Sequence, residues 1–229
     1  MKEIRDMLCT VAVGLEELVS ETVFVGGATV ILYDNKRTEE EQRPTQDVDC
    51  VIEITSRKLY NELEEKLRKK GFKHDQRQGA PVCRWIFNGV TTDIVPSKPE
   101  IIGFSNGWYP EGVANSIWYE LTKKIKIRIF TPVFFLATKI EALKDRGMSD
   151  IRLSRDFEDI VAIFDFQNDM DEFIFKADGP LRNFLRNEIK VLVKHHQIEE
   201  AIYANMPPRY REKEAPDVFE KMKFIASLK

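Results

Sequence analysis

A pair of glycines and a pair of aspartates, about twenty residues apart, constrain this chain more than any other feature. Gly26-Gly27 directly follows Thr22–Val25, a short run of β-branched and aromatic residues. Asp47-Val48-Asp49 opens a second run that becomes continuously apolar toward Ile54. The pattern predicts a buried strand, a tight turn, a short helix over residues 28–33, an exposed loop and then a central strand.

The two aspartates of the second strand are predicted to point to the same side. Side chains alternate across a strand, so Asp47 and Asp49 share one face with Thr45, while Val48 and Cys50 face the other way. Carboxylates about 7 Å apart along a strand repel each other unless a cation lies between them. Mg²⁺ suits this arrangement because it takes carboxylate oxygens and keeps positions for phosphate and water, and Mn²⁺ is an alternative.

A third carboxylate is expected on a neighbouring strand. Two β-rich runs, 82–87 and 90–95, flank Asn88-Gly89, a dipeptide typical of a two-residue hairpin turn. Asp93 is the one acid in the second run, where a carboxylate is costly unless it is paired or bound to a metal. Together with the aspartate pair, Asp93 completes a predicted two-metal site.

These parts suit nucleotidyl transfer, in which an α-phosphoryl group moves between pyrophosphate and an acceptor oxygen. Asp47 and Asp49 are predicted to hold the metal on the triphosphate, and Asp93 to share a second metal and help deprotonate the acceptor hydroxyl. Gly26 and Gly27 are predicted to bring backbone N–H groups close to the phosphates, helped by the N-terminus of the following helix.

The whole chain predicts an α+β fold with two domains. A mixed sheet with flanking helices is expected up to about residue 130, and it ends in the alternating basic and apolar strand 124–130. Thr131-Pro132 is typical of a helix start. Further helices are expected over residues 132–146, from Ser154, and over about 181–195 and 216–228. We therefore predict a catalytic core over residues 1–130 and a helical region over 131–229 that completes the active-site cleft.

The ordered set Gly26-Gly27, Asp47-x-Asp49 and Asp93 resembles the signature of the DNA polymerase β-like nucleotidyltransferase superfamily. Within it, the run Arg43-Pro44-Thr45-Gln46-Asp47-Val48-Asp49 and the segment 134–159 look like the AbiEii-type, toxin-like family. The resemblance covers about residues 22–165. It implies a polymerase β-like core and a metal-dependent enzyme that moves an NMP from an NTP to a hydroxyl.

The same resemblance implies active-site roles for Lys139 and Asp156. On the helix 132–146, Lys139 lies off the apolar stripe and shares its side with Phe135 and Arg146, so it is predicted either to reach the triphosphate or to be solvated. Asp156 lies in the first turn of its helix, where acids are also expected for helix-dipole reasons.

The residues predicted to contact the NTP phosphates differ in part from those of the toxin-like family. Many toxin members carry a serine that contacts phosphate where this chain has Gly27, so that contact is expected from the backbone alone. Arg43 and Thr45 precede the aspartate pair and are predicted nucleotide-binding residues, although a solvated loop charge is an equal interpretation of Arg43.

Family likeness ranks the acceptors as a tRNA 3′ end, then a protein side chain, then a small molecule, and it implies a cognate antitoxin as a partner. Two alternatives remain open. One is a small-molecule enzyme similar to aminoglycoside adenylyltransferases. The other is a non-catalytic relative that binds nucleotide, RNA or a partner protein as an antitoxin does.

Composition adds only broad limits. With a net charge of −3 the chain has no global field for nucleic acid, so RNA binding needs a local basic patch such as strand 124–130, which also fits a wet sheet face. No eighteen-residue apolar run occurs, so no membrane association is expected. Three scattered cysteines, Cys9, Cys50 and Cys83, predict buried thiols in a reducing cytoplasm.

Overall fold

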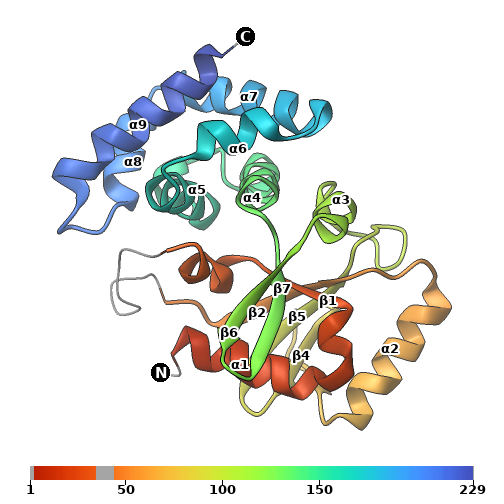
Figure 1. Ribbon diagram of the computed structural model, residues 1–229. Helices are drawn as coiled ribbons and strands as arrows, with labels where there is room; N and C mark the ends of the chain where they lie inside the picture. The colour runs from red at the N-terminus through yellow and green to blue at the C-terminus, as the bar shows by residue number, and fades with distance from the viewer. Residues whose placement is uncertain (1–2, 35–43, 229) are drawn as a thin grey trace. The chain divides into compact units, whose positions relative to one another are not determined.

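The computed structural model describes residues 3–34 and 44–228 of the chain (Figure 1). The chain divides into two compact units. One takes Met1–Ile31 and Thr38–Thr131, and the other takes Leu32–Arg37 and Pro132–Lys229. Each unit buries its own set of apolar side chains. Within the described residues, no helix is both long enough and apolar enough to cross a membrane.

The first unit is built on a mixed sheet that, in the described residues, has seven strands in the order β3-β4-β5-β2-β1-β7-β6. The pairs β2/β5 and β1/β7 are parallel, and the other neighbouring pairs are antiparallel. The strands are β1 (Thr22–Val25), β2 (Asp47–Ile52), β3 (Lys73–His74), β4 (Arg84–Phe87), β5 (Val90–Pro96), β6 (Ile117–Thr122) and β7 (Ile125–Ile129). The strand with the aspartate pair lies at the centre of this sheet, as predicted.

One face of the sheet of the first unit is covered by a helix. Helix α1 (Ile4–Leu15) packs across β2, β4, β5 and β7. Gly14 lets this helix approach closely, because a Cβ there would lie 2.4 Å from the ring of Phe87. The strand registers place Phe87 on the face opposite Asp47 and Asp49. The acids therefore lie on the face that α1 leaves uncovered.

The described part of the first unit contains further helical segments. They are η1 (Glu16–Ser20), η2 (Gly27–Leu32), α2 (Arg57–Lys69) and α3 (Tyr109–Ala114). Ser56 caps α2 by accepting a hydrogen bond from the backbone N–H of Leu59. The buried residues of α2 are Tyr60, Leu63 and Leu67. Leu59 is not part of this buried face, and 42% of it is exposed.

The second unit is helical in its described part, and Figure 1 shows its helices from α4 to α9. Pro132 occupies the first position of α4. Ser154 caps α5 by accepting a hydrogen bond from the backbone N–H of Phe157. The helical segments are α4 (Pro132–Arg146), η4 (Ile151–Leu153), α5 (Arg155–Phe166), α6 (Met170–Lys176), α7 (Gly179–Val193), α8 (Ile198–Asn205) and α9 (Arg211–Ser227).

The sequence patterns do not predict several short elements. The helices α3 and α8 and the sheet-edge strand β6 were not predicted. The predicted basic strand is β7, and it is not an edge because β1 and β6 flank it. These elements are short, so their apolar periodicity covers too few residues to stand out from loop composition.

Candidate functional site

The first unit brings the three predicted acids onto one face of two neighbouring strands. Asp47 and Asp49 alternate along β2 with fully buried Val48, so both lie on the uncovered face. β5 runs parallel to β2 with Asp93 opposite Asp49. Residues opposite each other in neighbouring strands point to the same side, so Asp93 joins the pair. Sequence spacing predicts that Asp47 and Asp49 share a face, whereas the place of Asp93 beside them depends on the parallel pairing of β2 with β5.

An arginine that the sequence analysis did not select lies among these acids. Arg84 of β4 is opposite Asp93 in the hairpin. Its Nε is 2.8 Å from Asp93 Oδ1, and its Nη2 is 2.7 Å from Asp93 Oδ2. The same Nη2 lies 3.5 Å from Asp47 Oδ2. The hydrogen bonds to Asp93 raise the pKa of Arg84, so its guanidinium stays charged.

The hairpin turn contains the signal that would have found this arginine. Asn88 and Gly89 both have positive φ values, 47° and 78°, and form the two-residue turn between β4 and β5. Because the turn consists of residues 88 and 89, Phe87 pairs with Val90, and each residue further back along β4 pairs with one further along β5. This register places Arg84 opposite Asp93.

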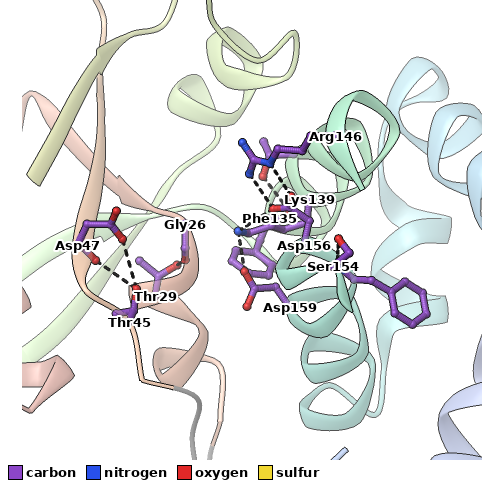
Figure 2. Close-up of polar contacts among 12 residues, drawn as sticks. Gly26, Thr29, Thr45, Asp47, Phe135, Lys139, Arg146, Ser154, Asp156 and Asp159 are labelled. Carbon is purple, nitrogen blue, oxygen red and sulfur yellow. Dashed lines mark hydrogen bonds and ion pairs between the residues drawn. The ribbon is translucent and has the colours of Figure 1, made fainter. Parts of the chain in front are cut away.

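Gly26 lies against the second aspartate. Its φ is +71°, which disfavours any side chain, and a Cβ there would lie 2.0 Å from Asp49 Oδ2. Its carbonyl oxygen accepts hydrogen bonds from the backbone N–H and the hydroxyl of Thr29, at 3.1 and 2.9 Å (Figure 2). Only glycine therefore allows the turn to come this close to Asp49.

The helix after the turn has the predicted length but is a 3₁₀ helix. Gly27 begins η2, a 3₁₀ segment of six residues rather than an α-helix. A single short 3₁₀ segment has few aligned peptide dipoles, so the helix contribution to phosphate binding is smaller than the sequence analysis assumes. The backbone of Gly26 and Gly27 remains the predicted phosphate contact.

The loop before β2 contains the other predicted nucleotide-binding residues. The Thr45 hydroxyl lies 3.4 Å from both the carbonyl oxygen and Oδ1 of Asp47 (Figure 2). This position holds Thr45 beside the first aspartate, whose side chain is 37% exposed. Arg43 lies outside the described residues.

The donor set of the uncovered face suits a hard divalent cation. Its three carboxylates supply the oxygens that Mg²⁺ or Mn²⁺ prefers. Within residues 3–34 and 44–228, no three acidic, histidine or cysteine side chains are grouped closely enough to hold a metal as they stand. Arg84 supplies the positive charge that balances Asp93 and part of Asp47. Metal binding to all three acids would therefore require Arg84 to share them.

The second unit brings together the two residues singled out there by resemblance. Lys139 Nζ lies 3.4 Å from Asp156 Oδ1 and 2.6 Å from Asp159 Oδ2. Arg146 donates from Nε and Nη2 to Asp156, at 2.8 and 3.0 Å (Figure 2). Only 12% of the Lys139 side chain is exposed, so the interpretation of Lys139 as a solvated lysine is wrong. Its contact with a triphosphate stays a prediction.

The cations around Asp156 determine its protonation. Burial alone would raise the pKa of Asp156, but hydrogen bonds from Arg146 and the charge of Lys139 outweigh it. The net result is a pKa below the ordinary value of 3.8. Asp156 is therefore a carboxylate at neutral pH. Asp159 does not stand out in the sequence, because its pairing with Lys139 depends on how α4 packs against α5.

The basic strand β7 is occupied by local contacts. Arg128 donates hydrogen bonds to the carbonyl oxygens of Val113 and Ser20, at 2.8 and 3.3 Å. Lys126 Nζ lies 3.7 Å from Oε2 of Glu120 on β6. Both contacts match a wet sheet face, and binding of RNA by this strand stays a prediction.

Comparison with known proteins shows the fold. No family model matches the chain, and no curated protein matches it. Among solved structures, it is similar to the crystal structure of an antigenic nucleotidyltransferase-like protein from Paracoccidioides brasiliensis. That match has a TM-score of 0.50 and 19% identity, over 89% of this chain and 94% of the other. The expected fold, a polymerase β-like nucleotidyltransferase core with a C-terminal helical region, is confirmed.

Proposed function

We propose that this chain is a metal-dependent nucleotidyltransferase that moves an NMP from an NTP to a hydroxyl acceptor. One observation carries the proposal: Asp47, Asp49 and Asp93 share the uncovered face of the sheet, with the Gly26 turn against Asp49. Clustered carboxylates are costly unless they serve a cation. A protein that only bound nucleotide would gain nothing from three of them.

The proposed reaction forms one bond and breaks another. The acceptor hydroxyl oxygen bonds to the α-phosphorus, the bond from that phosphorus to the pyrophosphate oxygen breaks, and the hydroxyl proton leaves to a base. Asp47, Asp49 and Asp93 would hold Mg²⁺ or Mn²⁺, which supplies charge stabilisation for the attacking and leaving oxygens when it is bound. The backbone of Gly26 and Gly27 would receive the phosphates.

Two residues of the second unit are included in the proposal because of the family likeness. Lys139 and Asp156 occupy the positions that the family likeness marks as active-site residues, and they form one charge cluster. Lys139 would have to exchange Asp159 for a phosphate in order to bind the triphosphate, because its Nζ is already 2.6 Å from that carboxylate. Asp156 would keep that cluster balanced.

The finer assignment to the AbiEii-type, toxin-like family rests on the sequence runs around Asp47 and Lys139. It makes a tRNA 3′ end the first acceptor to test and a cognate antitoxin the first partner. Protein side chains and small molecules are the other acceptors in the same assay.

The test incubates the purified chain with each α-³²P-labelled NTP, Mg²⁺ and total RNA, and separate reactions contain protein or aminoglycosides. We expect label transfer that disappears in Asp47→Ala and Asp49→Ala. A matched control is Asp6→Ala, an exposed aspartate of the same unit on α1, which packs on the other face of the sheet. Absence of transfer to every acceptor, together with absence of NTP-dependent Mn²⁺ binding, would refute the proposal.

A further inference from the structure

A cavity of about 350 Å³ opens on the first unit beside the first aspartate. Its lining is mainly polar and includes the side chains of Gln46, Asp47, Arg77, Gln78, Arg84 and Thr91. No aromatic side chain is part of this lining among the described residues. The cavity therefore suits a strongly hydrogen-bonding ligand better than a stacked base or an apolar group.

Arg77 is held in place by a buried aspartate. Its Nε lies 2.9 Å from Asp75 Oδ1, its Nη2 lies 2.5 Å from Asp75 Oδ2, and its backbone N–H donates to Oδ1 at 3.1 Å. Only 2% of the Asp75 side chain is exposed, against 69% for Arg77. Hydrogen bonds from Arg77 lower the pKa of Asp75 to about 2, so this pair stays ionised at any working pH.

A second pair with the same spacing shows what is particular about Arg77. Asp150 holds Arg152 through the same atoms, Nε, Nη2 and the backbone N–H. Arg152 also donates from Nη1 to Glu200 at 3.0 Å, so its remaining guanidinium edge is used. Within residues 3–34 and 44–228, the side-chain hydrogen bonds of Arg77 all go to Asp75. Its outer edge thus remains available to a ligand in the cavity.

The strand order places the cavity across the acids from the glycine turn. Gly26 follows β1, whereas Arg84 belongs to β4, and β2 and β5 with the three acids lie between them. β1 and β4 are three strand spacings apart, about 14 Å. In an in-line displacement the attacking and leaving groups lie on opposite sides of the phosphorus. If the turn receives the leaving phosphates, the side nearer Arg84 faces the attacking group.

We propose that this cavity binds a phosphate group of the acceptor, with the outer guanidinium edge of Arg77 as its main contact. The proposal rests on the proposed nucleotidyltransferase function and names the chemistry of its acceptor. A guanidinium whose orientation is already fixed loses little rotational freedom when it binds phosphate. The two lining carboxylates, Asp47 and Asp75, are each already close to an arginine, so the cavity offers little to a polycationic acceptor.

The phosphate can come from a nucleic-acid backbone or from a small phosphorylated molecule. A binding assay on the full chain, without NTP or divalent metal, separates these sources. The probe is a 5′-fluorescein single-stranded RNA of about twelve nucleotides with a 3′-hydroxyl, long enough to span a typical single-strand site. It is followed by anisotropy at low salt. Competitors are adenylyl-(3′→5′)-adenosine, AMP, inorganic phosphate and, as the ligand without phosphate, adenosine.

We expect Arg77→Gln to weaken probe binding about tenfold, the effect of losing one charge-assisted hydrogen bond. Arg152→Gln is the matched control and should bind like the unmodified chain, because it removes the same local pair away from the cavity. Competition by the dinucleotide alone identifies a nucleic-acid backbone. Competition also by AMP and inorganic phosphate identifies a small phosphorylated acceptor.

Equal affinity of Arg77→Gln and Arg152→Gln would overturn the proposal, as would competition by adenosine equal to that of the dinucleotide. So would an Arg77→Gln variant that loses NTP affinity instead, because the phosphate would then belong to the nucleotide. If Arg77→Gln loses probe binding and the unmodified chain transfers no nucleotide to any acceptor, the phosphate site is supported and the nucleotidyltransferase function is refuted. If the unmodified chain does transfer a nucleotide and Arg77→Gln has the same acceptor KM, only the phosphate site is refuted.

Discussion

Replacing Arg84 with methionine tests whether this residue neutralises the three acids. The guanidinium makes two hydrogen bonds to Asp93, at 2.8 and 2.7 Å, and lies 3.5 Å from Asp47. Methionine has a similar length and fills similar space but carries no charge. The variant would leave three carboxylates on one face with their arginine partner removed.

The expected loss follows from the geometry of this pair. Two unit charges about 4 Å apart attract each other by about 4 kcal/mol at the effective dielectric constant of a partly buried site. The side chains of Arg84 and Asp93 are 26% and 13% exposed, so water screens part of this energy. Hydrogen bonds to charged groups have a net value of about 1.5–3 kcal/mol. We therefore expect Arg84→Met to lower the free energy of unfolding by about 2–3 kcal/mol in a chelator.

Urea unfolding in EDTA and in millimolar Mg²⁺ measures this effect. Mg²⁺ should restore more than half of the loss in Arg84→Met and should stabilise the unmodified chain less, because there the metal competes with a guanidinium. Arg68→Met is the matched control: Arg68 pairs with Glu64 and Glu65 on the surface of α2 and should cost less than about 1 kcal/mol. A loss below about 0.5 kcal/mol, equal in EDTA and Mg²⁺, would refute the reasoning.

Three further changes test other parts of the structure. Gly26→Ala should lower the free energy of unfolding by at least about 2 kcal/mol, because Gly26 has a positive φ and a Cβ there would clash with Asp49. Gly79→Ala is the control: Gly79 also has a positive φ but lies in open space, so the loss should be about half as large. Asp156 has a lowered pKa, so its contribution to stability is complete above about pH 5 and is lost as pH falls through the folded pKa. Asp156→Asn should therefore flatten the dependence of the unfolding free energy on pH below about 5, measured by urea titrations at successive pH values. Lys139→Met should lower the unfolding free energy by about 3 kcal/mol because it leaves two buried carboxylates short of a cation, and Lys139→Arg should recover most of it in the same titrations.

The prediction for Asp93 concerns turnover. Under the proposed function, Asp93→Asn should reduce kcat by at least about 100-fold while changing the NTP dissociation constant far less, since its role is on the acceptor side. Rapid-quench turnover and equilibrium NTP binding measure the two quantities. Equal losses in both would contradict that role.

The acids could be placed from sequence because local rules determine their positions. Alternation along β2 puts Asp47 and Asp49 on one face, and the Asn88-Gly89 turn fixes which residues of the hairpin pair. The same register places Arg84 opposite Asp93, but an arginine is not a metal ligand, so its residue type does not mark it as part of a metal site. This part of the candidate site therefore required no knowledge of tertiary packing beyond the parallel pairing of β2 with β5.

Lys139 illustrates what sequence patterns do not contain. Helical periodicity correctly grouped it with Phe135 and Arg146, and its Nζ lies 5.8 Å from the Phe135 ring centroid. Periodicity does not say what packs against that side. The partner is α5, whose Asp156 and Asp159 bury the ammonium group. Lys139 is therefore largely buried through tertiary pairing, which its residue type and spacing do not reveal.

The two charge clusters differ in a way that bears on the proposed chemistry. In the second unit, Asp156 and Asp159 face two cations, Lys139 and Arg146, so their formal charges cancel without a ligand. In the first unit Arg84 pairs with Asp93 and lies near Asp47, and the three carboxylates together with Arg84 have a formal charge of −2. A divalent cation restores balance in the first cluster and would upset it in the second. We therefore expect chelator-sensitive stability to disappear in Asp47→Asn/Asp49→Asn and to persist in Asp156→Asn, and urea unfolding with and without EDTA measures both.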